Sequence, residues 1–155
     1  MKKIRVIALL IIMSLLASIS VPAFAAKSVK GDVVYTSKKY GFSLKIPASW
    51  KGKYVVQEAT FPIDGYKGVS FNVYYNNKKQ SYPVLTIITS KSKQSIVENP
   101  FAKYLGAKKG VYYGYICNVG DADAYLLKHP AVLNMISKMT AEDAPKVAKT
   151  FKFIK

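Results

Sequence analysis

The sequence predicts an α+β protein built on a largely antiparallel β-sheet. Segments of alternating apolar and polar residues fill the first two thirds of the chain, helical patterns follow between residues 121 and 149, and one more alternating segment comes after them. Strands followed by helices and a closing strand are typical of α+β folds. No internal repeat and no low-complexity tract interrupts this order.

Residues 1–25 have the order of a cleavable secretory signal. Basic residues within positions 2–5 precede an apolar run over 6–16, and Ala23 and Ala25 stand where a signal peptidase requires small residues. The run is shorter than the ~20 apolar residues of a spanning helix, so we expect no transmembrane segment after cleavage. The expected organisation is a signal peptide at 1–25, a flexible lead-in at 26–32 and a single globular domain at 33–155. The domain is expected outside the cytoplasm, either secreted or periplasmic.

The strands are expected from residues that alternate with a period of two. Phe42, Leu44 and Ile46 give one buried face, and Pro47 ends that strand. The clearest strand has Val69, Phe71, Val73 and Tyr75 on one face, with Ser70, Asn72 and Tyr74 on the other. Further strands are expected at 33–36, 54–61, 84–89, 111–119 and 151–153. The polar turn at 76–79 is followed by 80–83, which makes the connection longer than a tight hairpin.

Helices are expected mainly in the last third of the chain. A short helix is predicted around 101–105, and others at 121–128 and 130–139, the latter with an apolar stripe of Val132, Met135, Ile136 and Met139. Asp143 is expected to cap a last short helix that carries Pro145 in its first turn.

Two segments resemble those of PsbP-like (Mog1/PsbP-fold) domains. They are Tyr35-Thr-Ser-Lys-Lys-Tyr-Gly-Phe-Ser-Leu-Lys-Ile-Pro-Ala-Ser-Trp50 and Thr150-Phe151-Lys152-Phe153. Gly41 allows a turn with positive φ, Phe42 enters the core, and Trp50 is expected to fold back over one end of the sheet. The resemblance implies an α/β/α sandwich around an antiparallel sheet. Members include accessory proteins of photosystem II, partners of a nuclear-transport GTPase and secreted bacterial proteins of unassigned role. The resemblance therefore implies a non-enzymatic, partner-binding function.

The charge of the chain is strongly positive. The expected signal holds three of the 24 basic residues and none of the eight acidic ones, so the remainder carries +13 and its 21 basic residues are all lysines. Such a charge favours encounter with anionic polymers and membrane surfaces. Lysine lacks the planar fork with which arginine reads guanine or clamps phosphate, and export makes nucleic acid an uncommon partner.

Candidate chemistry is sparse. Cys117 and His129 are the single residues of their kinds, which rules out an intrachain disulfide and suggests a nucleophile and base. We instead expect Cys117 to be a buried apolar residue on a strand face and His129 to be a loop or capping residue. Asp121 and Asp123 lack the remaining ligands of a calcium loop, so they are expected to cap a helix. No catalytic residue, metal site or cofactor is expected.

The binding residues we single out combine lysines and tyrosines. Stacking on tyrosine next to lysine suits glycan or single-stranded nucleic acid, although tyrosine is equally common on half-exposed sheet faces. The candidate surface comprises Tyr74, Lys78, Lys79, Lys108, Lys109 and Tyr112.

The sequence therefore predicts an exported, non-enzymatic binding or accessory domain that engages a protein partner at the cell envelope. The alternative is a binder of anionic wall polymer or membrane surface through lysines and tyrosines. The sequence leaves the oligomeric state open.

Overall fold

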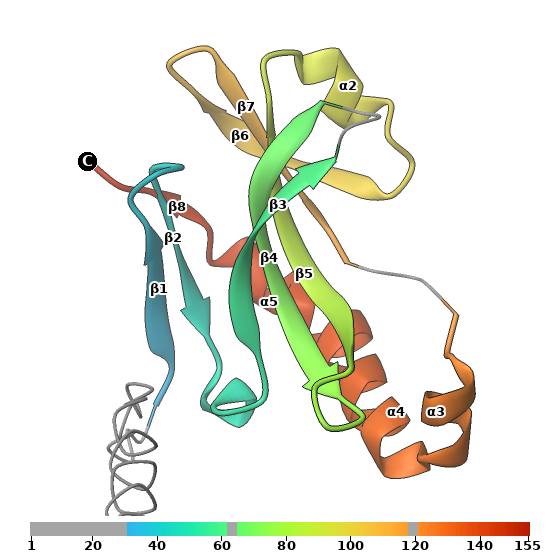
Figure 1. Ribbon diagram of the computed structural model, residues 1–155. Coiled ribbons are helices and arrows are strands. Elements are labelled where there is room, and N and C mark those ends of the chain that lie inside the picture. Colours follow the sequence, from blue (N-terminus) through green and yellow to red (C-terminus); the bar gives the residue numbers. More distant parts are fainter. Residues whose placement is uncertain (1–30, 62–64, 118–120) are drawn as a thin grey trace, which may run out of the picture.

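The computed structural model describes residues 31–61, 65–117 and 121–155 (Figure 1). The expected signal peptide and most of the expected lead-in lie outside the described residues. Within the described part of the chain, no helix is long and apolar enough to cross a membrane.

The described residues form a mixed α/β structure whose two sheets are antiparallel throughout. A three-stranded sheet has the order β1-β2-β8, and a five-stranded sheet has the order β3-β4-β5-β7-β6. The expected antiparallel α+β class is confirmed. The strands are β1 (Val33–Ser37), β2 (Phe42–Ile46), β3 (Val55–Phe61), β4 (Tyr66–Tyr75), β5 (Gln80–Ser90), β6 (Ala102–Lys108), β7 (Val111–Ile116) and β8 (Lys152–Phe153).

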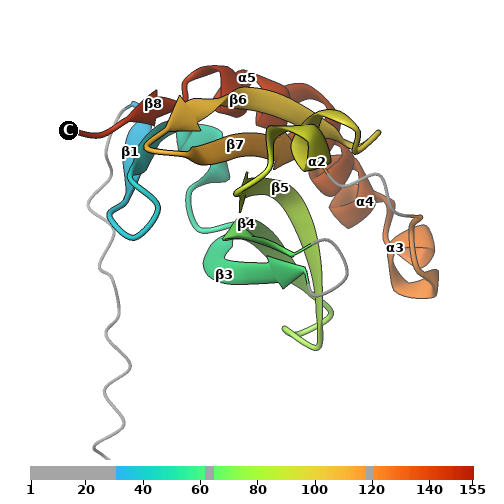
Figure 2. The same ribbon diagram turned by 90° about the horizontal axis from the view of Figure 1, so that it is seen from above.

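The helical elements cover different parts of the five-stranded sheet. The long C-terminal helical run lies behind β4 and β5 in Figure 1, whereas the short α2 sits against the ends of β5, β6 and β7 (Figures 1 and 2). These elements are η1 (Ala48–Trp50), α2 (Lys93–Val97), α3 (Ala124–Lys128), α4 (Pro130–Ser137), η2 (Lys138–Asp143) and α5 (Ala144–Lys149).

Alternation on β2 and β4 places the main core between the sheets and the C-terminal helices. Phe42, Leu44 and Ile46 of β2 are buried, as are Val69 and Phe71 of β4, and all five belong to one apolar cluster. Burial of such side chains contributes roughly 1.5–3 kcal/mol each. The opposite face of β4 and β5 is also mostly buried, and there Ser70 Oγ lies 3.0 Å from Thr86 Oγ1.

The predicted helix around 101–105 is wrong, since that segment is strand β6. Ala102 pairs with Ile116 and Lys108 pairs with Val111, so β7 satisfies the backbone groups that a helix would have satisfied internally. The helix lies earlier instead, at Lys93–Val97, where the Ser92 hydroxyl accepts a hydrogen bond from Ser95 N at 3.3 Å.

The connection between β4 and β5 is also tighter than predicted. Tyr75 pairs directly with Gln80, so 76–79 is the whole turn, and Asn76, Asn77 and Lys78 adopt positive φ within it. The register shifts where Phe71 pairs with Leu85 and Asn72 with Pro83. Such an irregularity accommodates a proline inside a paired strand.

Asp143 does not cap a helix, contrary to the prediction. It has helical backbone angles and no capping hydrogen bond, and α4, η2 and α5 follow one another without a break. The segment η2 is a π-helix that precedes Pro145. Proline removes a hydrogen bond and crowds the carbonyl four residues earlier, and a π-turn lets the helix continue past this disruption.

Of the two acids expected to cap a helix, Asp123 caps α3 and Asp121 does not. Asp123 Oδ1 accepts a hydrogen bond from Leu126 N at 2.9 Å as the N-cap, and its Oδ2 accepts from Tyr75 Oη at 2.6 Å. The Tyr75 hydrogen bond lowers the pKa of Asp123, and burial together with this bond raises the pKa of Tyr75 to about 12. Asp121 is exposed.

Trp50 lies over the end of the core, as the sequence predicts. It is fully buried, packs edge-on against Tyr54 and donates from Nε1 to Asp143 Oδ2 at 3.1 Å. Lys138 Nζ donates to the other oxygen of Asp143 at 2.9 Å. Burial opposes ionisation of Asp143, but these two donors outweigh it and lower the pKa of the carboxyl. The π-segment is thereby tied to the β2–β3 connection.

The low pKa of Asp143 predicts a pH-dependent stability. Because the folded pKa lies below the unfolded value of about 4, the ionised carboxylate stabilises the fold above that pH, and the stabilisation is lost as pH falls through the folded pKa. We expect Asp143→Asn to lower the free energy of unfolding by about 1–2 kcal/mol at neutral pH. In urea unfolding between pH 2.5 and 7, the difference from the native chain should shrink toward the acid end. Asp121→Asn is the control, and a difference that does not change with pH would contradict the assignment.

Candidate functional site

The candidate lysine and tyrosine residues fall into two groups at opposite ends of the five-stranded sheet. Tyr74, Lys78 and Lys79 lie at the β4–β5 turn, whereas Lys108, Lys109 and Tyr112 lie at the β6–β7 turn (Figure 1). Gln80 and Ser90 mark these two ends of β5, because Ser90 pairs with Tyr112. At ~3.3 Å per residue the ends are about 33 Å apart, so the residues do not form one surface.

Several of these side chains already have partners within the domain. Lys108 Nζ donates to the backbone oxygen of Ile154 and lies 5.9 Å from the centre of the Phe153 ring. Tyr74 Oη accepts a hydrogen bond from Gln57 Nε2 at 2.6 Å. Tyr112 packs against the small apolar cluster around Ile96. Lys78 and Lys79 remain exposed, and no acidic side chain of the described residues pairs with either of them.

Cys117 and His129 do not meet. His129 is the residue before Pro130, at the N-cap position of α4, where its side chain makes no capping bond. Its ring stacks on Tyr125 at 3.8 Å, and its Nδ1 lies 2.7 Å from Tyr125 O. It is thus a junction residue, as expected. Within the described residues, no group of three or more His, Cys, Asp or Glu side chains gathers where it could hold a metal ion.

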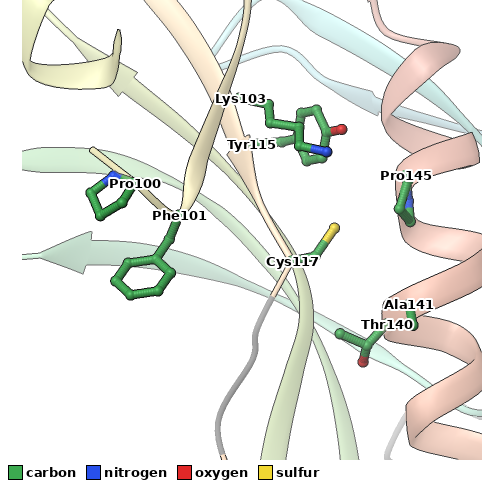
Figure 3. Close-up of a pocket in the computed structure, with 8 residues that line it drawn as sticks. All are labelled: Pro100, Phe101, Lys103, Tyr115, Cys117, Thr140, Ala141 and Pro145. Atoms are coloured by element: carbon green, nitrogen blue, oxygen red, sulfur yellow. The ribbon is translucent and has the colours of Figure 1, made fainter. Parts of the chain in front are cut away.

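Cys117 lines a pocket rather than lying fully in the core. The pocket has a volume of about 310 Å³ and opens between the β6 and β7 ends and the helical run (Figure 3). We call it the Cys117 pocket. Its lining residues are Pro100, Phe101, Lys103, Tyr115, Cys117, Thr140, Ala141 and Pro145.

Strand alternation and the π-segment together form this pocket. Lys103 of β6 pairs with Tyr115 of β7, and Cys117 follows two residues later on the same face. Figure 3 shows these three side chains directed toward the helix that carries Thr140, Ala141 and Pro145, while the Phe101 ring points the other way. The helical wall lies at η2 and its junction with α5. Widened π-turns of this kind frequently occur at functional sites.

The electrostatics of the pocket keep the cysteine protonated. Burial raises the pKa of the Cys117 thiol, and the nearby Lys103 ammonium only partly opposes this effect. Burial also raises the pKa of Tyr115. The Thr140 hydroxyl donates to Ile136 O at 2.8 Å. At neutral pH the pocket therefore presents apolar groups, a neutral thiol and one ammonium group, an arrangement suited to binding rather than to nucleophilic attack.

Sequence reasoning missed Lys103 as a pocket residue because its segment was predicted to be helical. The alternation of Lys103 with Tyr104 and Leu105 is too short to outweigh the helical signal. The wall at 140–145 was missed because Asp143 and Pro145 resemble a helix start. A signal for Cys117 was present, since it shares a strand face with Tyr115.

A second feature lies near the Cys117 pocket, on the surface formed by α2 and the start of β6. Three large apolar side chains of α2, β6 and the residues between them are solvent-exposed: Val97 at 58%, Phe101 at 62% and Tyr104 at 42%. We call these three residues the α2–β6 surface. Beside it is an open hollow lined by Tyr66, Ser95, Glu98, Asn99, Pro100 and Phe101.

No family model, no curated protein and no solved structure matches this chain.

The raised pKa of Cys117 predicts slow alkylation. Since the thiolate is the reactive form, iodoacetamide should label the folded protein more slowly at pH 7 than the urea-unfolded protein. Its rate should keep rising at pH values where the unfolded thiol has levelled off. Lys103→Met should slow labelling further, because Lys103 lowers this pKa. Mass spectrometry of the single cysteine measures the rate, and fast labelling of the folded protein at pH 7 would contradict the assignment.

Proposed function

We propose that this chain is an exported, non-enzymatic binding domain of the PsbP-like type, which engages a protein partner at the cell envelope. The observation that carries the proposal is the α2–β6 surface. Its three exposed apolar side chains come from α2, from the edge strand β6 and from the connection between them. Contiguous exposed apolar groups on a domain with a complete core commonly mark an interaction site.

The proposed PsbP-like fold is supported by the two segments that carry the resemblance. Gly41 has φ of 69°, Phe42 and Trp50 are buried, and β8 pairs with β2. Further support comes from α2, which contacts β5, β6 and β7, and from η2, which contacts β5. We infer that this is the α/β/α sandwich that the resemblance implies.

The α2–β6 surface suits a partner segment with an apolar anchor and acidic flanks. Lys93 Nζ lies 5.4 Å from the centre of the Tyr104 ring and supplies a positive charge beside the surface. Glu98 is the acid beside it, and its carboxylate accepts a hydrogen bond from Gln94. Aromatic anchors contribute most of the binding energy at protein interfaces, whereas exposed charges mainly guide association.

The alternative function is binding of anionic wall polymer or lipid headgroups. It is favoured by Lys78 and Lys79, which are exposed on a turn that projects from the end of the sheet (Figure 1). Binding through such lysines depends on unscreened charge, so it weakens strongly as salt rises.

We expect the mature domain, 26–155, to retain a discrete envelope protein through physiological and higher salt in a pull-down with stepwise elution. Phe101→Asp should weaken the affinity for the partner by at least about 30-fold and so lower the retained amount, since loss of a central aromatic anchor costs ~2 kcal/mol or more. Leu127→Asp is the matched control, because Leu127 is 67% exposed on α3 away from the surface. It should leave retention unchanged.

The same experiment decides between the two functions. Release of all material at modest salt, together with loss of binding in Lys78→Glu/Lys79→Glu but not in Phe101→Asp, would contradict the protein-partner proposal. That result would assign the function to the lysines of the β4–β5 turn.

A further inference from the structure

The Cys117 pocket adjoins the α2–β6 surface and shares Phe101 with it, whereas its other seven lining residues lie outside that surface. Val97 and Tyr104 do not line it, and the Phe101 ring points away from its helical wall (Figure 3). Its walls come from three elements distant in sequence: the start of β6, the end of β7 and η2 with the first residues of α5. The helical wall is fixed by Trp50, which holds Asp143 at the end of η2. The pocket is therefore formed by elements whose positions are fixed by contacts elsewhere in the fold.

The chemistry of the lining is apolar with one charge. Pro100, Phe101, Tyr115, Ala141 and Pro145 make the lining mostly apolar, and the thiol of Cys117 is neutral at physiological pH. Lys103 is the one ionisable cation among the lining residues. Within the described part of the chain, no carboxylate lies within ion-pair distance of its ammonium group. An apolar site with one unpaired ammonium complements a molecule that has an apolar body and one negative charge.

The volume limits the size of that molecule. A volume of about 310 Å³ lies at the small end of the ~300–1,000 Å³ range of small-molecule sites. The pocket therefore has room for a compound of about ten non-hydrogen atoms. Small ligands of this size in a half-open site reach dissociation constants on the order of 0.1–1 mM.

A single lysine also distinguishes between anions. Phosphate groups carry up to two charges and three acceptor oxygens, and proteins bind them through several donors or through arginine forks. The lining of this pocket offers one ammonium group and no arginine. A carboxylate, with one charge, matches that single donor.

We propose that the Cys117 pocket binds a short amphipathic carboxylate, an alkyl or aryl chain of about ten non-hydrogen atoms whose carboxylate pairs with Lys103. The apolar chain lies between Tyr115, Pro145 and Ala141. The contacts proposed here, with Lys103, Tyr115, Ala141 and Pro145, include no residue of the α2–β6 surface.

Octanoate and its neutral isostere octanamide test the proposal, with 3-phenylpropanoate as the aryl probe. Cys117 reports occupancy, since a bound chain shields the only thiol from iodoacetamide. For each variant we compare the alkylation rate with and without ligand at one pH, and we measure affinity by isothermal titration. Octanoate should slow alkylation of the native protein at least fivefold at saturation and bind at least fivefold more tightly than octanamide. If octanoate binds more tightly than 3-phenylpropanoate, the apolar part of the ligand is alkyl; if 3-phenylpropanoate binds more tightly, it is aryl.

Two variants locate the interaction. Lys103→Met keeps the apolar stem and removes the charge, so octanoate and octanamide should then bind equally. Lys91→Met, an exposed lysine outside the pocket, should keep the native preference. Ala141→Phe places a ring into the pocket from the exposed side of the helix and should abolish protection by both compounds while the thermal unfolding transition is retained.

Three results would overturn the proposal. Equal binding of octanoate and octanamide to the native protein would exclude the carboxylate contact. Unchanged preference for octanoate in Lys103→Met would exclude Lys103 as its partner. Absence of protection by any of the three compounds at 10 mM, about ten times the weakest expected dissociation constant, would show that the pocket is not a site for this class. None of these results depends on the partner pull-down, so the two proposals fail separately.

Discussion

The rings of Phe151 and Phe153 join the two sheets, and the rest of the structure depends on this contact. Phe151 stacks on Phe42 of the three-stranded sheet at 5.4 Å and packs against Tyr113 of the five-stranded sheet at 5.6 Å. Phe153 meets the same Tyr113 edge-on at 5.1 Å. Ile154 N donates to Gly41 O at 3.0 Å, which fixes this strand beside the β1–β2 turn. With one cysteine in the chain no intrachain disulfide can take over this role, so the aromatic contacts and the apolar core must stabilise the domain.

This closure also determines where the functional candidates lie. Because Phe151 stacks on Phe42 of β2 and Trp50 holds Asp143, the helical run has a fixed place beside β2 and β5, where residues of η2 and α5 face Lys103 and Cys117 across the pocket. The π-turn before Pro145 widens the helix there, and the Cys117 pocket opens beside it. Of the exposed residues of the α2–β6 surface, Val97 and Tyr104 lie outside this pocket, whereas Phe101 belongs to both. One corner of the molecule thus carries both a binding pocket and an apolar outer surface.

Features that depend on contacts between residues close in sequence could be predicted from the sequence, and features that depend on contacts between distant residues could not. Local patterns were sufficient for β2 and β4, where Phe42, Leu44 and Ile46 or Val69, Phe71 and Val73 alternate, and for Asp123, whose capping bond spans three residues. They failed at 101–105, because pairing with β7 overrides the helical preference of that segment. They failed at Asp143 as well, since its partners Trp50 and Lys138 come from another element and an earlier turn. The pocket joins residues about 40 positions apart, and no local pattern contains it.

We propose that the domain works by holding a partner at the α2–β6 surface. Site-specific photo-crosslinking in the producing cell tests it most directly, with p-benzoylphenylalanine placed at Phe101, at Leu127 and at Lys78 in separate strains. If the partner binds at the α2–β6 surface, position 101 should give a discrete protein adduct, and positions 127 and 78 should give none. Adducts to polymer or lipid from position 78, with none from position 101, would contradict it.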